Sequence, residues 1–211
     1  MVDELASAQS LFVRSMLIGI SIAAPLGPIG VLCVRRTLAQ GMVFGIATGL
    51  GAASADALYA ALAGTGLAFV SAFLVYQQIW IYLVGGVFLC YLGVRTALTV
   101  PADHGPDDRR EGLAGAYGTT FFLTITNPIT IISFAGIFAG LGLAGLNRNP
   151  ISVASMVFGV FIGSTLWWLF LSGIVSLFRT RFGTREMLWV NRISGAVILA
   201  FGIIAIAGVI L

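Results

Sequence analysis

The sequence contains very few charged residues and no lysine at all. Only 9% of the 211 residues are charged, and every basic residue is an arginine, whereas about a quarter of residues are charged in a typical soluble domain. Hydrophobic residues make up 59% of the chain, and the mean hydropathy is +1.04. This composition excludes a soluble globular domain and indicates an integral membrane protein.

Residues that hold metals or carry redox chemistry are also scarce. The chain has two cysteines and one histidine. Cys33 and Cys90 fall in different predicted helices without a CxxC pair, so a thiolate metal cage or a redox relay cannot form within one subunit. We interpret both as inert membrane thiols and expect no cofactor. An intramembrane hydrolase is the rival from another class, but it would need a Ser with a His or a second Asp in the membrane, whereas His104 lies in a polar stretch and Asp56 has no second acid beside it.

The amino terminus lacks the features of a cleavable signal. Asp3 and Glu4 stand where a signal peptide carries positive charge, and no small-residue cleavage site follows the first apolar block. We therefore expect the first helix to remain in the protein.

Charged clusters divide the chain into six apolar blocks. A helix needs about 20 apolar residues to cross a membrane, so the blocks predict an all-α integral membrane protein with six transmembrane helices. The blocks are residues 15–34, 43–63, 79–94, 113–146, 151–178 and 193–211.

The arginines divide unevenly between the two sides of such a six-helix chain. Nine lie after the first, third and fifth blocks, and only Arg14 and Arg148 lie on the other side. The positive-inside rule then places both chain termini outside the cytoplasm. The net charge of +3 comes mostly from the arginines that set this topology. It does not require a nucleic-acid partner. The nine are Arg35, Arg36, Arg95, Arg109, Arg110, Arg179, Arg181, Arg185 and Arg192.

Three short motifs recur in the same order in the two halves of the chain. "GPIGVLCV" from Gly27 resembles "NPITIISF" from Asn127, "GIATG" resembles "GVFIG", and "GVFLCYLG" resembles "GAVILAFG". The pattern predicts a three-helix repeat at 1–100, a cytoplasmic linker at 101–112 and a second repeat at 113–211. Because three is odd, the second repeat would be inverted, as in many secondary transporters.

The first pair of motifs places a proline inside an apolar run in each half. Gly27-Pro28 and Asn127-Pro128 each combine a residue that can cap a helix with proline, which suits the first helical position. We expect helices 1 and 4 to be broken near the midplane, so that two helix N-termini face a small anion such as a carboxylate. Ordinary proline kinks are the alternative. Pro25 has no counterpart in the second half and is assigned to the kink before the cap.

Asp56 is the only acidic residue between Glu4 and Asp103, and it lies inside the second apolar block. An acid at that depth costs at least about 2.5 kcal/mol and normally faces a cavity or a partner. It could pair with Arg14 or Arg148, balance a substrate ammonium, or carry a proton. Tyr59, three residues on, shares its helix face.

The equivalent helix of the second half supplies aromatic residues instead of charge. Aligning "GIATG" with "GVFIG" places Phe170 at the position of Asp56, with Trp167 and Trp168 within a turn. Two helix N-termini and one acid form a site for a zwitterion, the simplest being an amino acid. The candidate binding residues are Gly27, Pro28, Asp56, Tyr59, Asn127, Pro128, Thr130 and Trp168, with Asp56 also the candidate for proton coupling.

Five segments together resemble the LysE/RhtB family of bacterial amino-acid exporters. They are "PLGPIGVLCVRRTLAQG", "GLGAASADALY", "GGVFLCYLGVRTAL", "FFLTITNPITIISF" and "NRISGAVILAFG". The resemblance covers nearly the whole chain. It implies a multi-pass protein of a bacterial or archaeal inner membrane that exports amino acids using the proton motive force, as a homodimer. It also implies that Gly27, Pro28, Asp56, Asn127 and Pro128 line the pathway.

Other functions remain open at this stage. An exporter of a metal cation or another small solute would share the same architecture, although one Asp and two separated cysteines are few ligands for a metal. A scaffold that transports nothing is the remaining alternative, since a repeat reveals ancestry and not activity. The absence of a second intramembrane acid favours small neutral amino acids as substrates.

Overall fold

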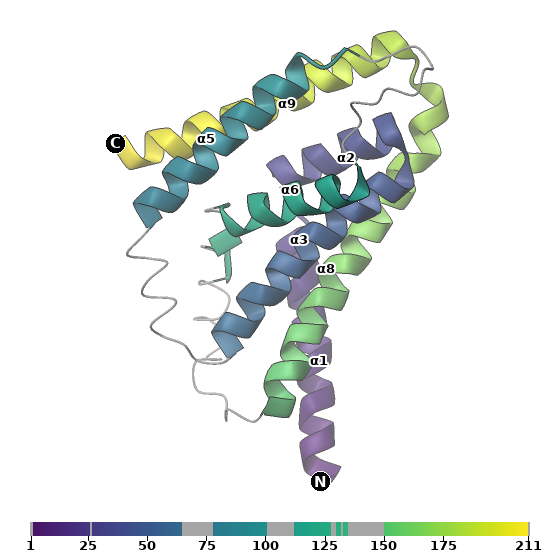
Figure 1. The fold of residues 1–211 in the computed structure, drawn as a ribbon. Helices are drawn as coiled ribbons and strands as arrows, with labels where there is room; N and C mark the ends of the chain where they lie inside the picture. The colour runs from purple at the N-terminus through teal and green to yellow at the C-terminus, as the bar shows by residue number, and fades with distance from the viewer. Residues whose placement is uncertain are drawn as a thin grey trace.

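The computed structural model describes residues 2–25, 27–64, 78–100, 112–127, 130–131, 133–134 and 150–210. Over these residues the secondary structure is entirely helical, as the sequence predicts (Figure 1). The elements are α1 (Val2–Ala23), α2 (Pro28–Gln40), α3 (Met42–Gly64), α5 (Gln78–Ala97), α6 (Leu113–Ile125), α8 (Pro150–Phe178), the short 3₁₀ helix η2 (Arg179–Arg181) and α9 (Thr184–Ile210).

Three segments in the described part are long and apolar enough to cross a membrane, namely Met42–Gly64, Pro150–Arg181 and Thr184–Gly208. A fourth span results if α1 and α2 are counted together across the bend between them. Two shorter apolar helices cover Tyr82–Ala97 and Leu113–Ile125. The helices therefore match a multi-pass integral membrane protein.

Several arginines assigned to loops lie within helices instead. Helix α9 begins at Thr184 rather than near residue 193, so Arg185 and Arg192 belong to its first turns. Arg35 and Arg36 similarly lie inside α2. The apolar blocks locate where hydrophobic residues begin, but arginine is a good helix former and lets a helix continue beyond its apolar part.

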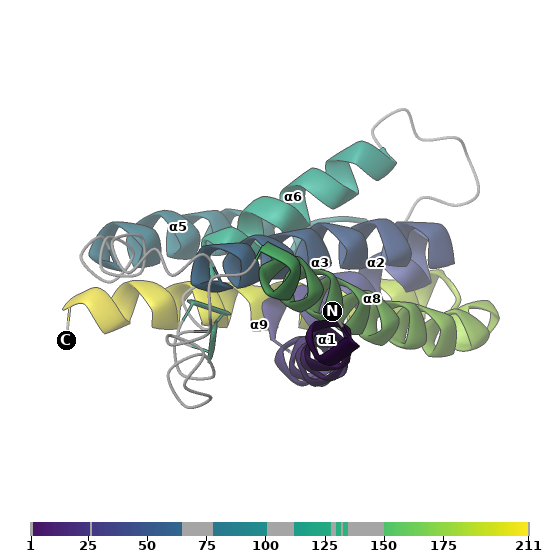
Figure 2. The same ribbon diagram turned by 90° about the horizontal axis from the view of Figure 1, so that it is seen from below.

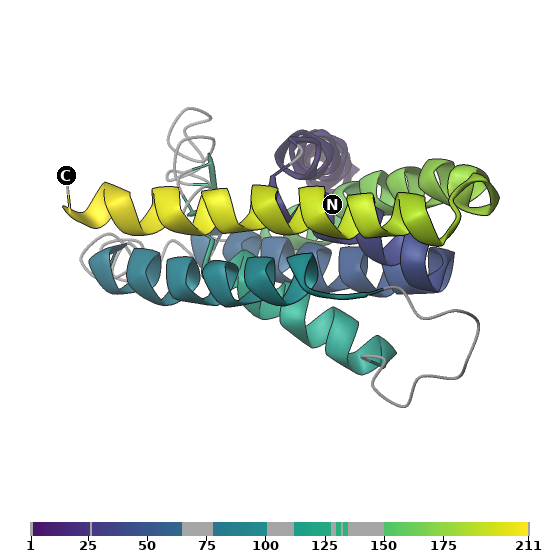
Figure 3. The same ribbon diagram turned by 90° about the horizontal axis from the view of Figure 1, so that it is seen from above.

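The long helices pack in pairs. Helix α1 packs along α8, α3 packs along both α8 and α6, and α5 lies beside α9. Figure 2 shows α1 against α8, and Figure 3 shows α5 and α9 running side by side over their length. Helix α2 lies between these groups and contacts α3, α8 and α9.

The α5 and α9 pair is held together by glycines of the repeated motifs. A Cβ on Gly86 would lie 3.0 Å from the carbonyl oxygen of Gly202, and one on Gly93 would lie 2.9 Å from that of Gly195. The first glycine of each motif thus contacts the second glycine of the other. Such close backbone approach is typical of small-residue interfaces between membrane helices.

The chain turns sharply between α1 and α2. The axes of the two helices differ by 80°. Proline has no N–H to donate to a helix, and Pro25 stands two residues after the end of α1. Its carbonyl accepts a hydrogen bond of 2.8 Å from the Gly27 amide. The carbonyl of Gly27 then accepts one of 3.1 Å from Val31, so that α2 begins with Pro28. Pro25 therefore has a specific position in the turn.

Candidate functional site

The second half of the chain contains a corresponding break after α6. This helix ends at Ile125, and the Asn127 carbonyl accepts a hydrogen bond of 3.2 Å from the Ile131 amide, as the Gly27 carbonyl does from Val31. Residues 130–131 and 133–134 are helical. Asn127 thus occupies the same position at the start of a helical turn as Gly27, whereas Pro128 lies outside the described residues.

Helix α2 folds back along α3 through a turn at Gly41. Gly41 has a φ of +102°, which favours glycine, and its amide donates to the Thr37 carbonyl. Side chains of α2 then meet α3 in antiparallel order, with Thr37 against Gly45 and Arg36 against Thr48. Ile29, in the first turn of α2, lies in one apolar cluster with Ala52 and Ala53 of α3, which precede Asp56 by about one turn.

Asp56 is buried, with 3% of its surface exposed, and its contacts come from α8. The hydroxyl of Ser164 donates a hydrogen bond of 2.7 Å to Oδ2 of Asp56. Nε1 of Trp168 in turn donates one of 3.2 Å to Oγ of Ser164. Of the two arginines considered as ion-pair partners, Arg14 is exposed and Arg148 lies outside the described residues.

Tyr59 connects the Asp56 helix to the second break. Its hydroxyl donates a hydrogen bond to the carbonyl of Ile125, the last residue of α6. Its ring lies against that of Phe134, with 5.3 Å between the centroids. Asn127 and Thr130, which lie between these two contacts in sequence, are both buried.

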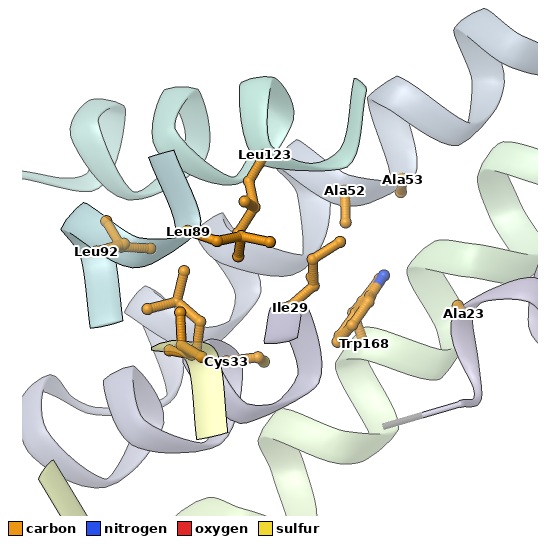
Figure 4. Close-up of a cluster of buried hydrophobic side chains, with 11 residues drawn as sticks. Ala23, Ile29, Cys33, Ala52, Ala53, Leu89, Leu92, Leu123 and Trp168 are labelled. Atoms are coloured by element: carbon orange, nitrogen blue, oxygen red, sulfur yellow. The ribbon is translucent and has the colours of Figure 1, made fainter. Parts of the chain in front are cut away.

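An apolar cluster brings together residues of α2, α3, α6 and α8. Ile29 from the first turn of α2 lies in this cluster with Ala52 of α3, Leu123 of α6 and Trp168 of α8 (Figure 4). Trp168 also packs so closely on Gly49 that a Cβ at that glycine would overlap its side chain. The first turn of α2 and the indole that bonds Ser164 therefore belong to the same apolar cluster.

Arg36 of α2 is only 2% exposed. Its Nη1 donates hydrogen bonds to Oγ1 of Thr48, the carbonyl of Ala116 and Oγ1 of Thr120. Its interpretation as a topology signal at a membrane surface is therefore incomplete, because a guanidinium in this position joins α2 to both α3 and α6.

The adjacent Arg35 and a second arginine tie α2 to other helices. Nε of Arg35 donates a hydrogen bond of 2.8 Å to Oδ1 of Asn191 on α9, whose Nδ2 donates one to the carbonyl of Thr99 after α5. Nε of Arg179 donates to the carbonyl of Leu38. Helix α2 is thus bonded to elements from both halves of the chain.

The structure thus brings Asp56 and Trp168 together through Ser164, and it joins Tyr59 to the segment before Asn127. Phe170, at the aligned position of Asp56, is 58% exposed and faces away from the interior. The sequence did not predict that Ser164 contacts Asp56, because a single serine in a membrane helix forms no recognisable motif. The sequence analysis also did not predict the burial of Arg36. The position of this residue directly after an apolar run is the signal that could have indicated it.

The two cysteines occupy separate places. Sγ of Cys33 lies 3.6 Å from the carbonyl oxygen of Gly45, to which it donates, and 3.5 Å from Oγ of Ser172. Cys90 packs against Gly202 in the α5 and α9 interface. Among the described residues, no three His, Cys, Asp or Glu side chains gather where they could hold a metal ion.

The sequence of the chain is similar to a known protein family. The family model described as "LysE type translocator" matches residues 20–208. The chain is 26% identical to "Putative amino acid efflux protein YcgF" of Bacillus subtilis over 92% of its length and 93% of that protein. It is 27% identical to "Chemotactic transduction protein ChpE" of Pseudomonas aeruginosa over 94% and 97%. No solved structure matches.

Proposed function

The chain belongs to the LysE type translocator family, a family of transporters, and on that premise we propose that it exports amino acids or related small zwitterions from the cytoplasm. The observation that carries the proposal is the buried carboxylate of Asp56, whose partner Ser164 is bonded to Trp168, a member of the apolar cluster that also holds Ile29 of the first turn of α2. The free N–H groups of a helix start attract a carboxylate, and Asp56 attracts an ammonium group. The name of YcgF, which describes amino acid efflux, supports this substrate class.

The second break supplies the other half of the proposed site. Asn127 caps a helical turn as Gly27 does, and Tyr59 holds the end of α6 beside it. We assign Gly27, Asn127 and Thr130 to the substrate carboxylate, together with Pro28 and Pro128. Asp56, Tyr59 and Trp168 form the side that receives the ammonium group.

An architecture of six spans in two inverted repeats, 1–100 and 113–211 with a linker at 101–112, fits this site. The reciprocal glycine contacts support it, because a two-fold axis that exchanges α5 and α9 also exchanges the Gly86–Gly202 and Gly93–Gly195 pairs. The same axis would exchange the α1 and α8 pair with the α6 and α3 pair. Substrate sites of inverted-repeat transporters lie where the two repeats meet near the midplane.

The proposal includes a direction and a driving force. The arginine distribution supports placing the ends of the chain outside the cytoplasm in a bacterial or archaeal inner membrane. Asp56 is the group proposed to carry the counter-moving proton, because buried acids in membrane helices commonly form proton pathways. The homodimer rests on the family resemblance alone.

The test uses purified protein in liposomes loaded with a panel of radiolabelled amino acids, with and without an imposed proton gradient. Gradient-dependent movement of at least one amino acid is expected. Asp56→Asn should abolish it while leaving the amount of folded protein unchanged, and Asp3→Asn, the same change outside the site, should transport normally. Movement of a divalent metal ion in place of every amino acid would establish the alternative cargo, and normal transport by Asp56→Asn would overturn the assigned site.

A further inference from the structure

We infer that Ser164 is a positioning residue of this site. Through Trp168, Ser164 transmits the charge state of Asp56 to the start of α2. The inference rests on the proposed function, since it describes how the two ends of the zwitterion site are coupled. It concerns a residue of α8 that carries no recognisable motif and that touches the proposed acid directly.

The geometry gives the single hydroxyl hydrogen of Ser164 a defined direction. Ser164 is fully buried, and its Oγ accepts the Trp168 Nε1 hydrogen at 3.2 Å while donating its own hydrogen to Asp56 Oδ2 at 2.7 Å. A hydroxyl has one hydrogen to donate, and an ionised carboxylate can only accept. This arrangement requires Oδ2 of Asp56 to act as an acceptor, as both oxygens do in an ionised carboxylate.

A change at Oδ2 of Asp56 would then alter both hydrogen bonds of Ser164. A proton on the Asp56 oxygen that faces Ser164 makes that oxygen a donor, so the Ser164 hydroxyl hydrogen has to leave this contact. A substrate ammonium that takes the same carboxylate oxygen competes with Ser164 in the same way. In either case the constraint that Ser164 places on the Trp168 indole changes.

The indole of Trp168 lies where such a change can reach α2. Its Cβ is fixed against Gly49 on α3, where no side chain could fit between them. The ring packs in the apolar cluster with Ile29, which belongs to the first turn of α2 (Figure 4). Asp56, Ser164, Trp168 and Ile29 thus form a continuous path from the acid to the half-helix that begins at Pro28.

Few other charged or titratable side chains approach this path in the described part of the chain. Cys33 of α2 lies in the same apolar cluster, and its thiol contacts the Gly45 carbonyl and Ser172. Tyr59 lies one turn away on α3 and donates to the Ile125 carbonyl. Arg36 of α2 is bonded at Thr48, two turns along α3 in the other direction. Arg14 of α1 is exposed. A pH response that requires both Asp56 and Ser164 is therefore assigned to their hydrogen bond.

The first experiment measures intrinsic tryptophan fluorescence of the purified protein in detergent as a function of pH, without any substrate. The chain has four tryptophans, so the signal is assigned by variants. A pH-dependent change is expected that is lost in Asp56→Asn, in Ser164→Ala and in Trp168→Phe. Trp167→Phe should retain it, because Nε1 of Trp167 is buried without a hydrogen-bond partner in the described structure.

The second experiment compares two serines of the same helix in the liposome assay. Ser164→Ala should slow transport about tenfold, the size expected for losing a hydrogen bond to a charged group, and should shift the pH profile. Ser172→Ala is the matched control, because Ser172 is equally buried on α8 but contacts Cys33. It should stay within about twofold of the wild type, as expected for a neutral contact.

The outcomes separate this inference from the proposed function. If a Ser164-dependent fluorescence titration is found but no amino acid moves, the proposed function fails and the coupling stands. Transport by Ser164→Ala with an unchanged rate and pH profile would overturn the coupling while leaving the function intact. If Ser164→Ala does not fold, Trp168→Phe decides, since it removes the hydrogen bond from Trp168 to Ser164 and keeps an aromatic ring.

Discussion

Arg36 on α2 donates a hydrogen bond of 3.0 Å to Oγ1 of Thr120 on α6, which lies 84 residues further along the chain. The same nitrogen also donates to Thr48 on α3 and to the carbonyl of Ala116. A buried guanidinium is costly unless its hydrogen bonds are made. This contact therefore fixes the half-helix that follows the first break against one helix from each half of the chain.

Replacing this guanidinium should destabilise the protein. Arg36→Gln is expected to reduce the free energy of unfolding by about 1.5–3 kcal/mol, because hydrogen bonds to a charged group are lost in the interior. The measurement is the thermal midpoint in detergent. Arg192→Gln, at an exposed position over the Trp189 ring, is the control and should change stability by no more than about 0.5 kcal/mol. Equal midpoints for the two variants would contradict the role of Arg36.

A serine at the start of α2 should separate folding from substrate binding. Gly27 is the N-cap residue, makes no side-chain cap, and has open space where a Cβ would lie. Gly27→Ser should therefore fold, with a stability gain of a few tenths of a kcal/mol from capping. Its hydroxyl would occupy N–H groups that are proposed to hold the substrate carboxylate, so KM should rise.

The matched control for that variant is Gly112→Ser. Gly112 is the N-cap residue of α6, also lacks a side-chain cap, and also has open space around its Cβ position. It lies outside the proposed site, so KM should not change. A KM for Gly27→Ser equal to that of the control would remove the start of α2 from the binding site.

The glycine interface between α5 and α9 predicts two substitutions of similar effect. A Cβ on Gly93 would meet the backbone nitrogen of Leu199 at 2.6 Å, and one on Gly195 would meet that of Ala97 at 2.5 Å. Each change to alanine should lower the free energy of unfolding by about 1–3 kcal/mol, because the added methyl group overpacks the interface. Gly118→Ala on α6, where the Cβ position is open, should cost nothing. Thermal midpoints measure all three, and strongly unequal losses at Gly93 and Gly195 would argue against a two-fold relation.

The breaks in the helices could be predicted because they depend on adjacent residues. Proline following a capping residue starts a helix wherever the chain places it, and Gly27 and Asn127 indeed begin helical turns. The start of α9 could not be placed in this way, because hydrophobicity reports where apolar residues begin and not where helical hydrogen bonding begins. Arg185 lies between two apolar blocks of the sequence, and it is nevertheless helical.

The sequence by itself determined the membrane class of the protein, its helical composition, the positions of the breaks and the singular acid at Asp56. Each follows from composition or from neighbouring residues. Only the tertiary structure decided that Ser164, 108 residues away, bonds Asp56 and that Arg36 is buried between α3 and α6. Such partners depend on how whole helices pack, and in a membrane helix a serine or a terminal arginine has the same local sequence signal whether it faces lipid, water or a buried acid.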